Sequence, residues 1–333
     1  MSNTLTNRHE IVFWVEARNC NYNGDPDFDN APRQIFETEH GFMTDVSLKR
    51  KVRDYVATAF GCKEGFDIFV KNGCNLNRNI AECVIEATGK GKISKGKNTA
   101  ESSAIATKKF WDVRTFGGVM STGLNAGQIQ GAVQFDMPIS YDEVQTKSAT
   151  ITRVAYANGD FTELSKYDEH GTSLSDDKKH KFGKKSFTNY ALFECHVFVS
   201  ANLAQKNGFT EEDLNILLES LMNMFSYQTS ASKAGMSVVG PVVVFKHIGT
   251  NGDNNPEQNA REALLGCCSA QKLFKLLNVH KKDGVTYPQT YEDYDATIDI
   301  KNIPNGVIVG FKYSPFSDVI WGSINDEWLK ELR

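Results

Sequence analysis

The strongest constraint on the fold is a strand, helix and strand pattern in the second half of the sequence. Residues 190–203, YALFECHVFVSANL, place apolar side chains at every second position, as strands do. Residues 210–225, TEEDLNILLESLMNMF, repeat apolar side chains at helical spacing behind Thr210, a favourable N-cap. The apolar run at 238–248, VVGPVVVFKHI, predicts another buried strand. Short connections join these elements, so together they predict one β-α-β unit.

The first half of the sequence offers a matching set of elements. Residues 9–17, HEIVFWVEA, predict a buried strand, and residues 44–60 predict a helix capped by Thr44 or Asp45. A later candidate strand is GQIQGAVQFDM at 127–137. Two such units predict an α+β, ferredoxin-like sandwich, in which an antiparallel sheet carries two helices on one face.

Composition narrows the class of protein. A chain of 333 residues with 40% hydrophobic content can fill a substantial core. The net charge of -4 argues against coating nucleic acid through the overall field, so any such contact must come from local patches. The seven cysteines form no C-x-x-C pair, and no apolar run has the length of a membrane span. We therefore expect a cytoplasmic protein with no membrane partner.

Two long segments between these elements have the character of insertions. Residues 61–110 contain GKGKISKGK, and residues 140–189 contain DDKKHKFGKK. Neither segment shows the periodicity of a core, and a tail from about residue 281 is locally acidic before it returns to apolar, strand-like runs. A small core with long insertions indicates that the loops carry the function.

Three aspartates at every second position follow the first strand. They are Asp25, Asp27 and Asp29. The spacing matches the start of a calcium loop, but the sixth position holds Asn30 rather than Gly, and the twelfth holds Phe36 rather than Glu. We therefore interpret the stretch as a surface turn whose Asp and Asn side chains bond their own backbone, and predict no metal there.

The helix at 44–60 carries a local group of cations. Lys49, Arg50 and Arg53 occupy one arc beside the apolar stripe, while Lys51 points elsewhere. Guanidinium groups suit phosphate because their paired N–H donors match two oxygens. The alternative is a solvated helix face, partly neutralised by Asp54.

A glycine-rich stretch occupies residues 110–131. It cannot be a phosphate loop, because Leu124 and Asn125 stand where Lys and Ser or Thr are required. A tight connection and a backbone surface approached by a polymer both remain open. The histidines show no metal-ligand spacing, no catalytic triad can be nominated, and His196 is interpreted as a packed residue on a sheet face.

Several motifs together carry a family resemblance. They are NGDPD with APR, TDVSLKRKVRDY, DVRTFGG, GQIQGAVQF, ITR at 151–153 and LFECHVFVSANLA. In this order, over roughly residues 9–250, they resemble the backbone subunit of type I CRISPR Cascade complexes, the Cas-seven family of the RAMP superfamily. The type I-C branch is the most similar, with type I-B next.

The resemblance implies a hand-shaped RAMP fold, with an RRM-like palm and inserted finger and thumb segments. The implied ranges are 1–60, 111–139 and 190–280 for the palm, 61–110 for the finger insertion, 140–189 for the thumb-containing insertion, and 281–333 for a C-terminal extension of the palm. No RNP1-like aromatic sequence is present, so such a palm would not bind RNA as a standard stacking RRM.

The resemblance also implies a function and partners. The chain would be a scaffold and not an enzyme, with no cofactor, whose copies stack into a helical filament along one CRISPR RNA. Guide bases would then pair with target DNA, so sequence is read by base pairing while the protein supplies charge and shape. Other Cascade subunits and a recruited helicase-nuclease are the further implied partners.

The implied RNA ligands combine the helix cations with residues of the other motifs. They are Arg33, Lys49, Arg50, Arg53, Arg114, Gly117, Gly118, Arg153 and Lys233. The finger lysines, which would attract target or displaced DNA and could otherwise be a solvated loop, are Lys90, Lys92, Lys95 and Lys97.

Two other functions stay open at this stage. Related type III backbone subunits cut target RNA with an aspartate after the first strand, where Asp25, Asp27 and Asp29 lie, and such metal-dependent cleavage needs these carboxylates to gather an ion. The other is a protein-only interaction module that uses the acidic helix and the tail.

Overall fold

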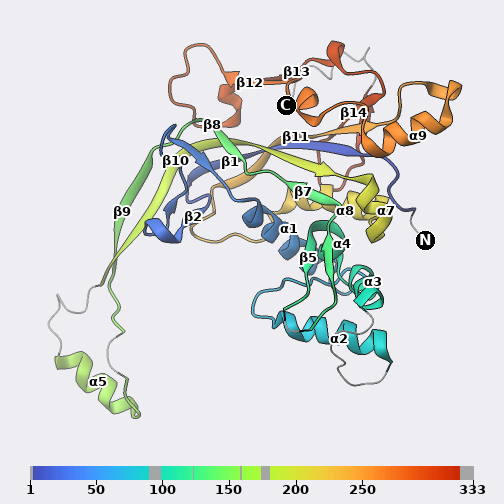
Figure 1. Ribbon diagram of the computed structural model, residues 1–333. Helices are drawn as coiled ribbons and strands as arrows, with labels where there is room; N and C mark the ends of the chain where they lie inside the picture. Colours follow the sequence, from blue (N-terminus) through green and yellow to red (C-terminus); the bar gives the residue numbers. More distant parts are fainter. Residues whose placement is uncertain (1–2, 90–98, 123, 158–159, 174–180, 323–333) are drawn as a thin grey trace.

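The computed structural model describes residues 3–89, 99–122, 124–157, 160–173 and 181–322 (Figure 1). The strands are β1 (His9–Cys20), β2 (Gly24–Asp25), β3 (Ala31–Pro32), β4 (His40–Phe42), β5 (Gly117–Val119), β6 (Gln128–Gln130), β7 (Val133–Phe135), β8 (Ile139–Glu143), β9 (Thr146–Arg153), β10 (Lys181–Val199), β11 (Met236–His247), β12 (Leu277–Lys281), β13 (Tyr294–Ile298), β14 (Val307–Lys312) and β15 (Ile320–Gly322). The helices are α1 (Asp45–Phe60), α2 (Leu76–Thr88), α3 (Thr99–Lys109), α4 (Trp111–Phe116), α5 (Leu164–Ser173), α7 (Ala201–Asn207), α8 (Glu211–Asn223), α9 (Pro256–Leu265) and α10 (Ala270–Phe274).

A nine-stranded antiparallel sheet forms the centre of the molecule. Its main path runs β15-β14-β11-β1-β10-β8-β4, and β7 and β9 also pair with β10. Within it, β1, α1 and β7 form one strand-helix-strand set, and β10, α8 and β11 form the other, with the strand order β11-β1-β10-β7. The expected mixed architecture with a large antiparallel sheet is confirmed. Thr210 caps α8 in a capping box with Asp213, as the sequence predicts.

Both faces of this sheet are covered. Alternate side chains of β1 point to opposite faces, so that Ile11 and Phe13 pack with α1 and α8, while Val12 and Trp14 pack under the C-terminal segment. That segment includes β12 and β13, which lie across the sheet from the helices (Figure 1). Double-sided burial explains why β1 has an uninterrupted apolar run instead of an alternating one.

The region between α1 and β7 contains a second small core, contrary to the expectation that residues 61–110 lack one. Ile80 and Val84 of α2 pack with Ala106 of α3, and Met120 and Ala126 of the glycine-rich stretch complete the cluster. Sequence periodicity missed this core because its members come from short helices and from a stretch beyond the insertion. The expected strand at 127–137 is also divided, because β6 pairs with β5 whereas β7 joins the main sheet.

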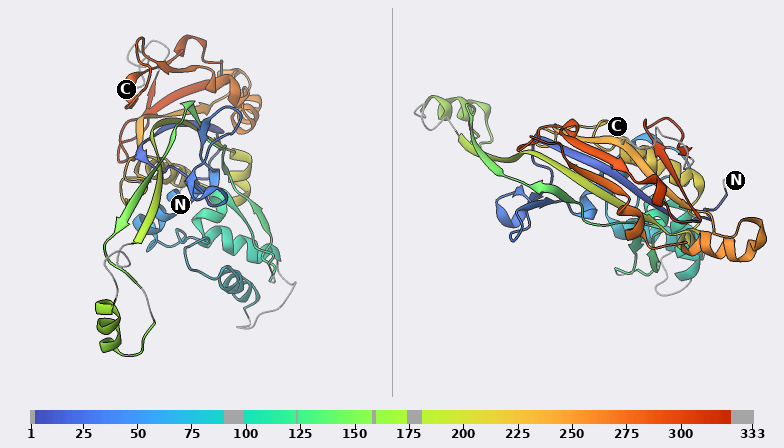
Figure 2. Two further views of the ribbon diagram at one scale, coloured as in Figure 1. Left: turned by 90° about the vertical axis from the view of Figure 1, so that its left-hand side faces the viewer. Right: turned by 90° about the horizontal axis from the view of Figure 1, so that it is seen from above.

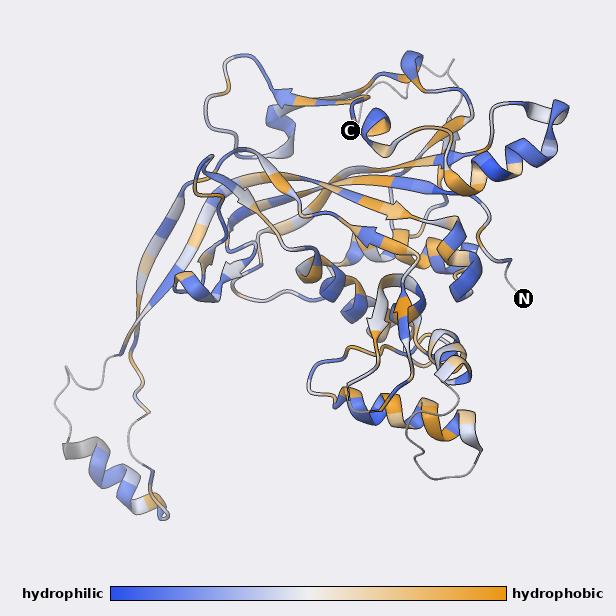
Figure 3. Cartoon of the chain, in the orientation of Figure 1, coloured by the Kyte–Doolittle hydropathy of each residue, from blue (hydrophilic) through white to orange (hydrophobic). Residues whose placement is uncertain are grey.

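A long two-stranded arm projects from the sheet. The first half of β10 pairs with β9 from Lys181↔Arg153 to Thr188↔Thr146, and the second half continues into the sheet centre. The arm extends away from the body and carries α5 toward its outer end (Figures 1 and 2). Apolar colouring is strong in the central sheet and also appears on α2, while α5 is largely hydrophilic (Figure 3). No helix of the described ranges is long and apolar enough to cross a membrane.

Candidate nucleic-acid interface

Two of the predicted helix cations face inward. Lys49 Nζ donates to Asp45 Oδ2 at 2.9 Å and to Gln134 Oε1 at 3.0 Å. Arg53 Nε donates to Asp112 Oδ2 at 2.7 Å, and its guanidinium lies 5.0 Å from the centroid of the Phe116 ring. Both side chains are largely buried. Lys49 and Arg53 therefore join α1 to β7 and α4. Much of the hydrogen-bonding capacity of these two side chains is used within the fold.

Asp112 explains why Arg53 is held so firmly. Its carboxylate also accepts hydrogen bonds from the backbone N–H groups of Phe69 at 2.6 Å and Val70 at 3.2 Å. The carboxylate is buried, so an unpaired negative charge there would be costly, and Arg53 supplies the counter-charge. The pair fixes the segment after α1 against α4.

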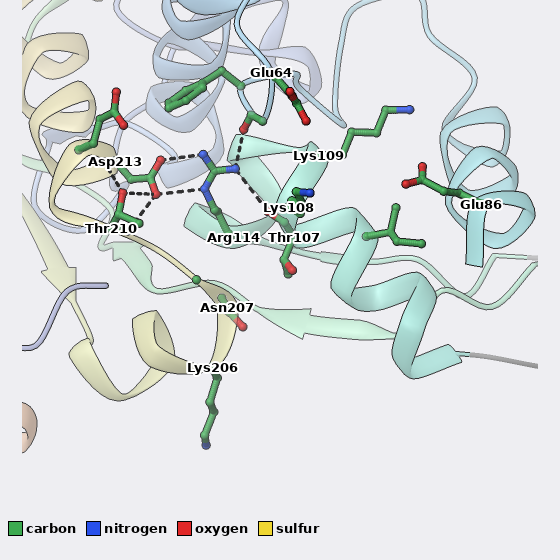
Figure 4. A pocket seen from close by; sticks show the side chains of 15 residues that line it. Glu64, Glu86, Thr107, Lys108, Lys109, Arg114, Lys206, Asn207, Thr210 and Asp213 are labelled. Atoms are coloured by element: carbon green, nitrogen blue, oxygen red, sulfur yellow. Dashed lines mark hydrogen bonds and ion pairs between the residues drawn. The ribbon is translucent and has the colours of Figure 1, made fainter. Parts of the chain in front are cut away.

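Arg114 requires a correction. Its Nε and Nη2 donate to Oδ2 and Oδ1 of Asp213 at 3.1 and 2.7 Å, while Nη1 donates to the carbonyl oxygens of Gly65 at 2.6 Å and Thr107 at 3.3 Å (Figure 4). The side chain is 8% exposed and lies in the wall of a cavity of about 830 Å³. With every guanidinium nitrogen engaged, Arg114 stabilises the junction of α4 and α8 and is not free to bind RNA phosphate.

The two predicted glycines also differ from each other. Gly117 has φ +86°, and a Cβ there would lie 2.5 Å from the carbonyl oxygen of Ile129, because Gly117 pairs with Gln130. The β5-β6 hairpin itself therefore requires glycine at 117. At Gly118 a Cβ would meet only the side chains of Met120 and Phe69, at ordinary contact distances of 3.9 Å. A polymer approach at Gly118 stays a prediction.

The aspartate-rich turn is held by local hydrogen bonds, as predicted. Asp25 Oδ1 accepts from the backbone N–H of Asp27 at 3.2 Å, and Asp25 Oδ2 pairs with Arg33 Nη1 at 3.1 Å. Asp29 ends the following short helix in the left-handed conformation, φ 52°. Within the described residues no group of three His, Cys, Asp or Glu side chains is arranged to hold a metal ion. The gathered carboxylates that metal-dependent cleavage needs are not formed at this turn.

The other predicted cations lie nearer the surface. Arg50 Nε pairs with Asp54 Oδ1 at 2.6 Å, and its side chain is 40% exposed. Arg153, at the end of β9, is exposed and donates to the carbonyl oxygen of Ala155 at 2.7 Å. The predicted DNA-binding residues Lys90, Lys92, Lys95 and Lys97 lie outside the described residues.

The arm carries cations that the sequence interpretation missed. They are Lys147, Lys181, Lys184 and Lys185, in addition to Arg153. Residues 146–155 and 181–189 contain no Asp or Glu. The sequence signal that could have revealed these cations is the absence of acidic residues in the two strands. It was obscured because the motif DDKKHKFGKK begins with two aspartates. Exposed apolar side chains, among them Ile151 and Phe182, lie between the cations.

Strand register places most of these cations on one side. Cross-strand partners point to the same face, and the pairs Lys181↔Arg153, Gly183↔Ile151, Lys185↔Ala149 and Phe187↔Lys147 follow at every second position. Four of the five arm cations therefore share a face, with Lys184 on the other. Along β10 that face continues to Ala191 and Phe193, which pack with α1 and α8. The cationic face of the arm thus continues the helix-covered side of the sheet.

Lys233 lies where the arm meets the body. Its Nζ donates to the carbonyl oxygens of Tyr22 at 2.6 Å and Asn21 at 3.3 Å. Burial and the positive charge of Lys51 lower the pKa of Lys233 from 10.5 to about 8, with a small opposing effect of Cys20. This lysine is therefore charged at pH 7 at a cost in free energy, and a bound anion would reduce that cost.

His196 lies on a sheet face, as predicted, but away from the cationic side. Its Nδ1 contacts Asp136 Oδ2 at 2.6 Å, its Nε2 contacts Glu194 Oε1 at 2.8 Å, and its ring stacks on Phe274 of α10 with centroids 4.0 Å apart. Burial lowers its pKa, but the hydrogen bonds and charges of the two carboxylates outweigh it and raise the pKa to about 9. His196 therefore helps to hold α10 against the sheet.

Comparisons with known proteins agree with the resemblance seen in the sequence. Residues 7–300 match the family described as CRISPR-associated protein Cas7. A CRISPR-associated protein Cas7 from Haloferax volcanii is 30% identical over 224 residues, which are 61% of this chain and 61% of that protein's length. The chain thus aligns with less than two thirds of that relative.

Two solved structures are similar at low sequence identity. A chain of a "CRISPR RNA-guided surveillance complex, pre-nicking" has a TM-score of 0.43 and 14% identity, with 79% of this chain and 83% of that chain covered. A chain of a "CRISPR RNA-guided surveillance complex" has a TM-score of 0.41 and 14% identity, with 80% of each chain covered. Because the family match extends over most of the 333 residues, this chain belongs to the CRISPR-associated protein Cas7 family.

Proposed function

We propose that this chain is a non-catalytic, guide-RNA-binding backbone subunit of a type I Cascade complex, most similar to the type I-C branch. Membership of the Cas7 family supports a role in a CRISPR complex. One structural observation supports the binding of RNA. The arm presents five cations and no carboxylate along its two paired strands, in a chain whose net charge is -4. A cationic ribbon on an acidic protein fits a polyanionic backbone, and its exposed apolar side chains can contact bases or a neighbouring protein.

In this proposal the sheet with α1 and α8 is an RRM-like palm, the α2-α3 unit is a finger, and the arm is the thumb. The C-terminal segment buries the sheet face on which a standard RRM stacks its bases, so RNA would bind on the helix-covered side and on the arm. Copies of the chain would assemble along one CRISPR RNA and expose its bases to target DNA, with other Cascade subunits and a helicase-nuclease as further partners. Contacts to phosphate would make binding strong but nearly independent of sequence.

The test is a binding measurement with unrelated labelled single-stranded RNAs over a range of salt concentrations. We expect affinities that differ little between sequences and fall steeply as salt rises. Protein expressed with its guide should also copurify with nucleic acid, seen as an A260/A280 ratio above that of protein alone. A protein that binds no RNA under low salt would overturn the proposal and favour a protein-only interaction module.

The cleavage alternative has a separate test. Guide-loaded protein would be incubated with complementary RNA and Mg²⁺, and the products examined for regularly spaced cuts. We expect intact RNA, since Asp25 is paired with Arg33, and among the described residues Asp25, Asp27 and Asp29 are not arranged as a group that could hold an ion. Cuts that disappear in Asp25→Ala would establish a metal-dependent ribonuclease instead.

A further inference from the structure

The loop between α8 and β11, residues 224–235, is held rigidly at the base of the arm. The backbone N–H of Arg18 donates to Gly235 O at 2.8 Å, and the N–H of Asn21 donates to Ser232 O at 2.8 Å. From the arm, Lys185 Nζ donates to Ala231 O at 3.1 Å. A Cβ at Gly235 would lie 1.7 Å from the carbonyl oxygen of Arg18, so the loop approaches β1 as closely as glycine permits. The loop is therefore a preformed surface.

Three lysines from three different elements converge on this loop. Lys51 comes from α1, Lys185 from β10, and Lys233 from the loop itself. The positive charge of Lys51 lowers the pKa of Lys233. Burial raises the pKa of the Cys20 thiol, and the charges of Lys233 and Lys185 oppose that increase. All three side chains are half-buried, and none forms an ion pair with a carboxylate of the described residues. Lys49, in contrast, forms an ion pair with Asp45.

Like charges brought together without a counter-ion are unfavourable, so the arrangement calls for an anion. The hydroxyls of Ser230 and Ser232 lie on the same loop and offer further donors. We propose that Lys51, Lys185 and Lys233 form a binding site for one backbone phosphate of RNA, where the arm joins the body. The inference rests on the proposed function and deepens it, since it names a site that anchors the strand as it passes from the body to the arm.

The site should depend on pH in a defined direction. The groups that face Lys233 are Lys51 from α1 and the thiol of Cys20 from β1, whose pKa burial raises to about 11, so that the thiol is neutral near pH 8. Lys185, from β10, adds a further positive charge beside Cys20. A bound phosphate would raise the pKa of Lys233 above about 8. The contribution of Lys233 to affinity is then fully present below about pH 8 and is lost as the pH rises from there through the higher pKa of the phosphate-bound state.

The experiment compares three variants with the wild-type chain in binding labelled single-stranded RNA. The first variant is K51Q/K185Q/K233Q, and the matched control, K206Q/K272Q/K301Q, removes three exposed lysines on other elements. We expect the first to weaken RNA binding about 10- to 30-fold and to reduce the slope of log Kd against log salt by about 0.7, the contribution of one neutralised phosphate on a single strand. The control should change affinity by less than about 2-fold. Thermal unfolding checks that both variants fold.

The third variant, K51R/K185R/K233R, separates charge from titration. Arginine stays protonated at all accessible pH values, so this variant should retain RNA affinity at pH 7 and lose the decline that wild type shows above about pH 8. A merely structural role of the lysines would not change the pH profile in this way. If the profile of the arginine variant matches wild type, the assignment of Lys233 as a phosphate ligand is wrong.

The outcomes distinguish the site from the proposed function. If wild type binds RNA with a steep salt dependence but the glutamine variant behaves like its control, the three-lysine site is overturned and the proposed function stands. If wild type binds no RNA, the proposed function itself fails. Titration with inorganic phosphate, followed by NMR of the lysine Nζ groups, supplies the last arm. Saturation by free phosphate at about millimolar concentration, with RNA affinity unchanged in the glutamine variant, would identify a small-anion site and overturn the assignment to RNA.

Discussion

The cations of the body and those of the arm differ in one respect, which is whether a carboxylate accompanies them. In the body, Arg53 and Arg114 are paired with Asp112 and Asp213, and both pairs are buried. On the arm, Lys147 and Lys184 are exposed and form no ion pair with the described residues. A conspicuous run of basic residues on a helix can therefore be structural, whereas the scattered lysines on the two arm strands have no carboxylate partner among the described residues.

Breaking a body pair should have the largest effect. We expect Arg114→Met to lower the free energy of unfolding by about 3–5 kcal/mol, because it leaves Asp213 buried without its counter-charge. Denaturant unfolding measures the change. The second variant, R114M/D213N, should recover part of the loss, since an asparagine side chain can still accept the capping hydrogen bonds of α8 without a buried charge. Arg153→Met on the arm is the matched control, expected within about 0.5 kcal/mol of wild type.

Removing the arm charges should leave stability unchanged and weaken RNA binding. We expect K147Q/K181Q/K184Q/R153Q to lose about 10- to 100-fold in RNA affinity at about 0.15 M salt, with a shallower salt dependence. Fluorescence anisotropy with labelled RNA measures both quantities. The opposite result would be a full loss of RNA affinity in Arg53→Met and an unchanged affinity in the arm variant. That result would show that the body, and not the arm, binds RNA.

His196 offers a paired cation that can be titrated. Its folded pKa of about 9 exceeds the ordinary 6.5, so its contribution to stability is fully present below about pH 6.5 and is lost as pH rises through 9. We expect a loss on the order of 1–3 kcal/mol between these limits. Unfolding at several pH values, with His196→Gln as the reference, isolates the effect. Identical pH profiles for the two proteins would contradict the assignment.

Gly117 and Gly118 offer a second comparison, between a backbone position that requires glycine and one that does not. Gly117→Ala should destabilise the chain by about 1–3 kcal/mol, because its positive φ and its contact with β6 both disfavour a Cβ. Gly118→Ala should stay within about 1 kcal/mol of wild type, since its surroundings can accept a methyl group. Thermal unfolding of the pair suffices. Equal losses would show that neither residue is specialised for the hairpin.

Much of the core was predictable from local sequence. The strand at 9–17, the helix at 44–60, the Thr210 cap and the strands around 190–203 and 238–248 all appear near their expected positions. Each of these predictions depends on apolar periodicity or on a helix cap. Both are local signals, which involve residues within one or two helical turns or neighbouring residues of one strand. The second small core was not predictable, because it joins short helices to the glycine-rich stretch.

The sequence by itself determined the main strands and helices of the central sheet, the character of the aspartate turn and the family resemblance. Only the tertiary structure decided which cations are available. Arg53 meets Asp112 across 59 positions, and Arg114 meets Asp213 across 99. Conversely, Lys51, Lys185 and Lys233 meet no carboxylate of the described residues although they too come from distant positions. Charge pairing depends on distances of a few ångströms in space, which the spacing of residues along a chain does not specify.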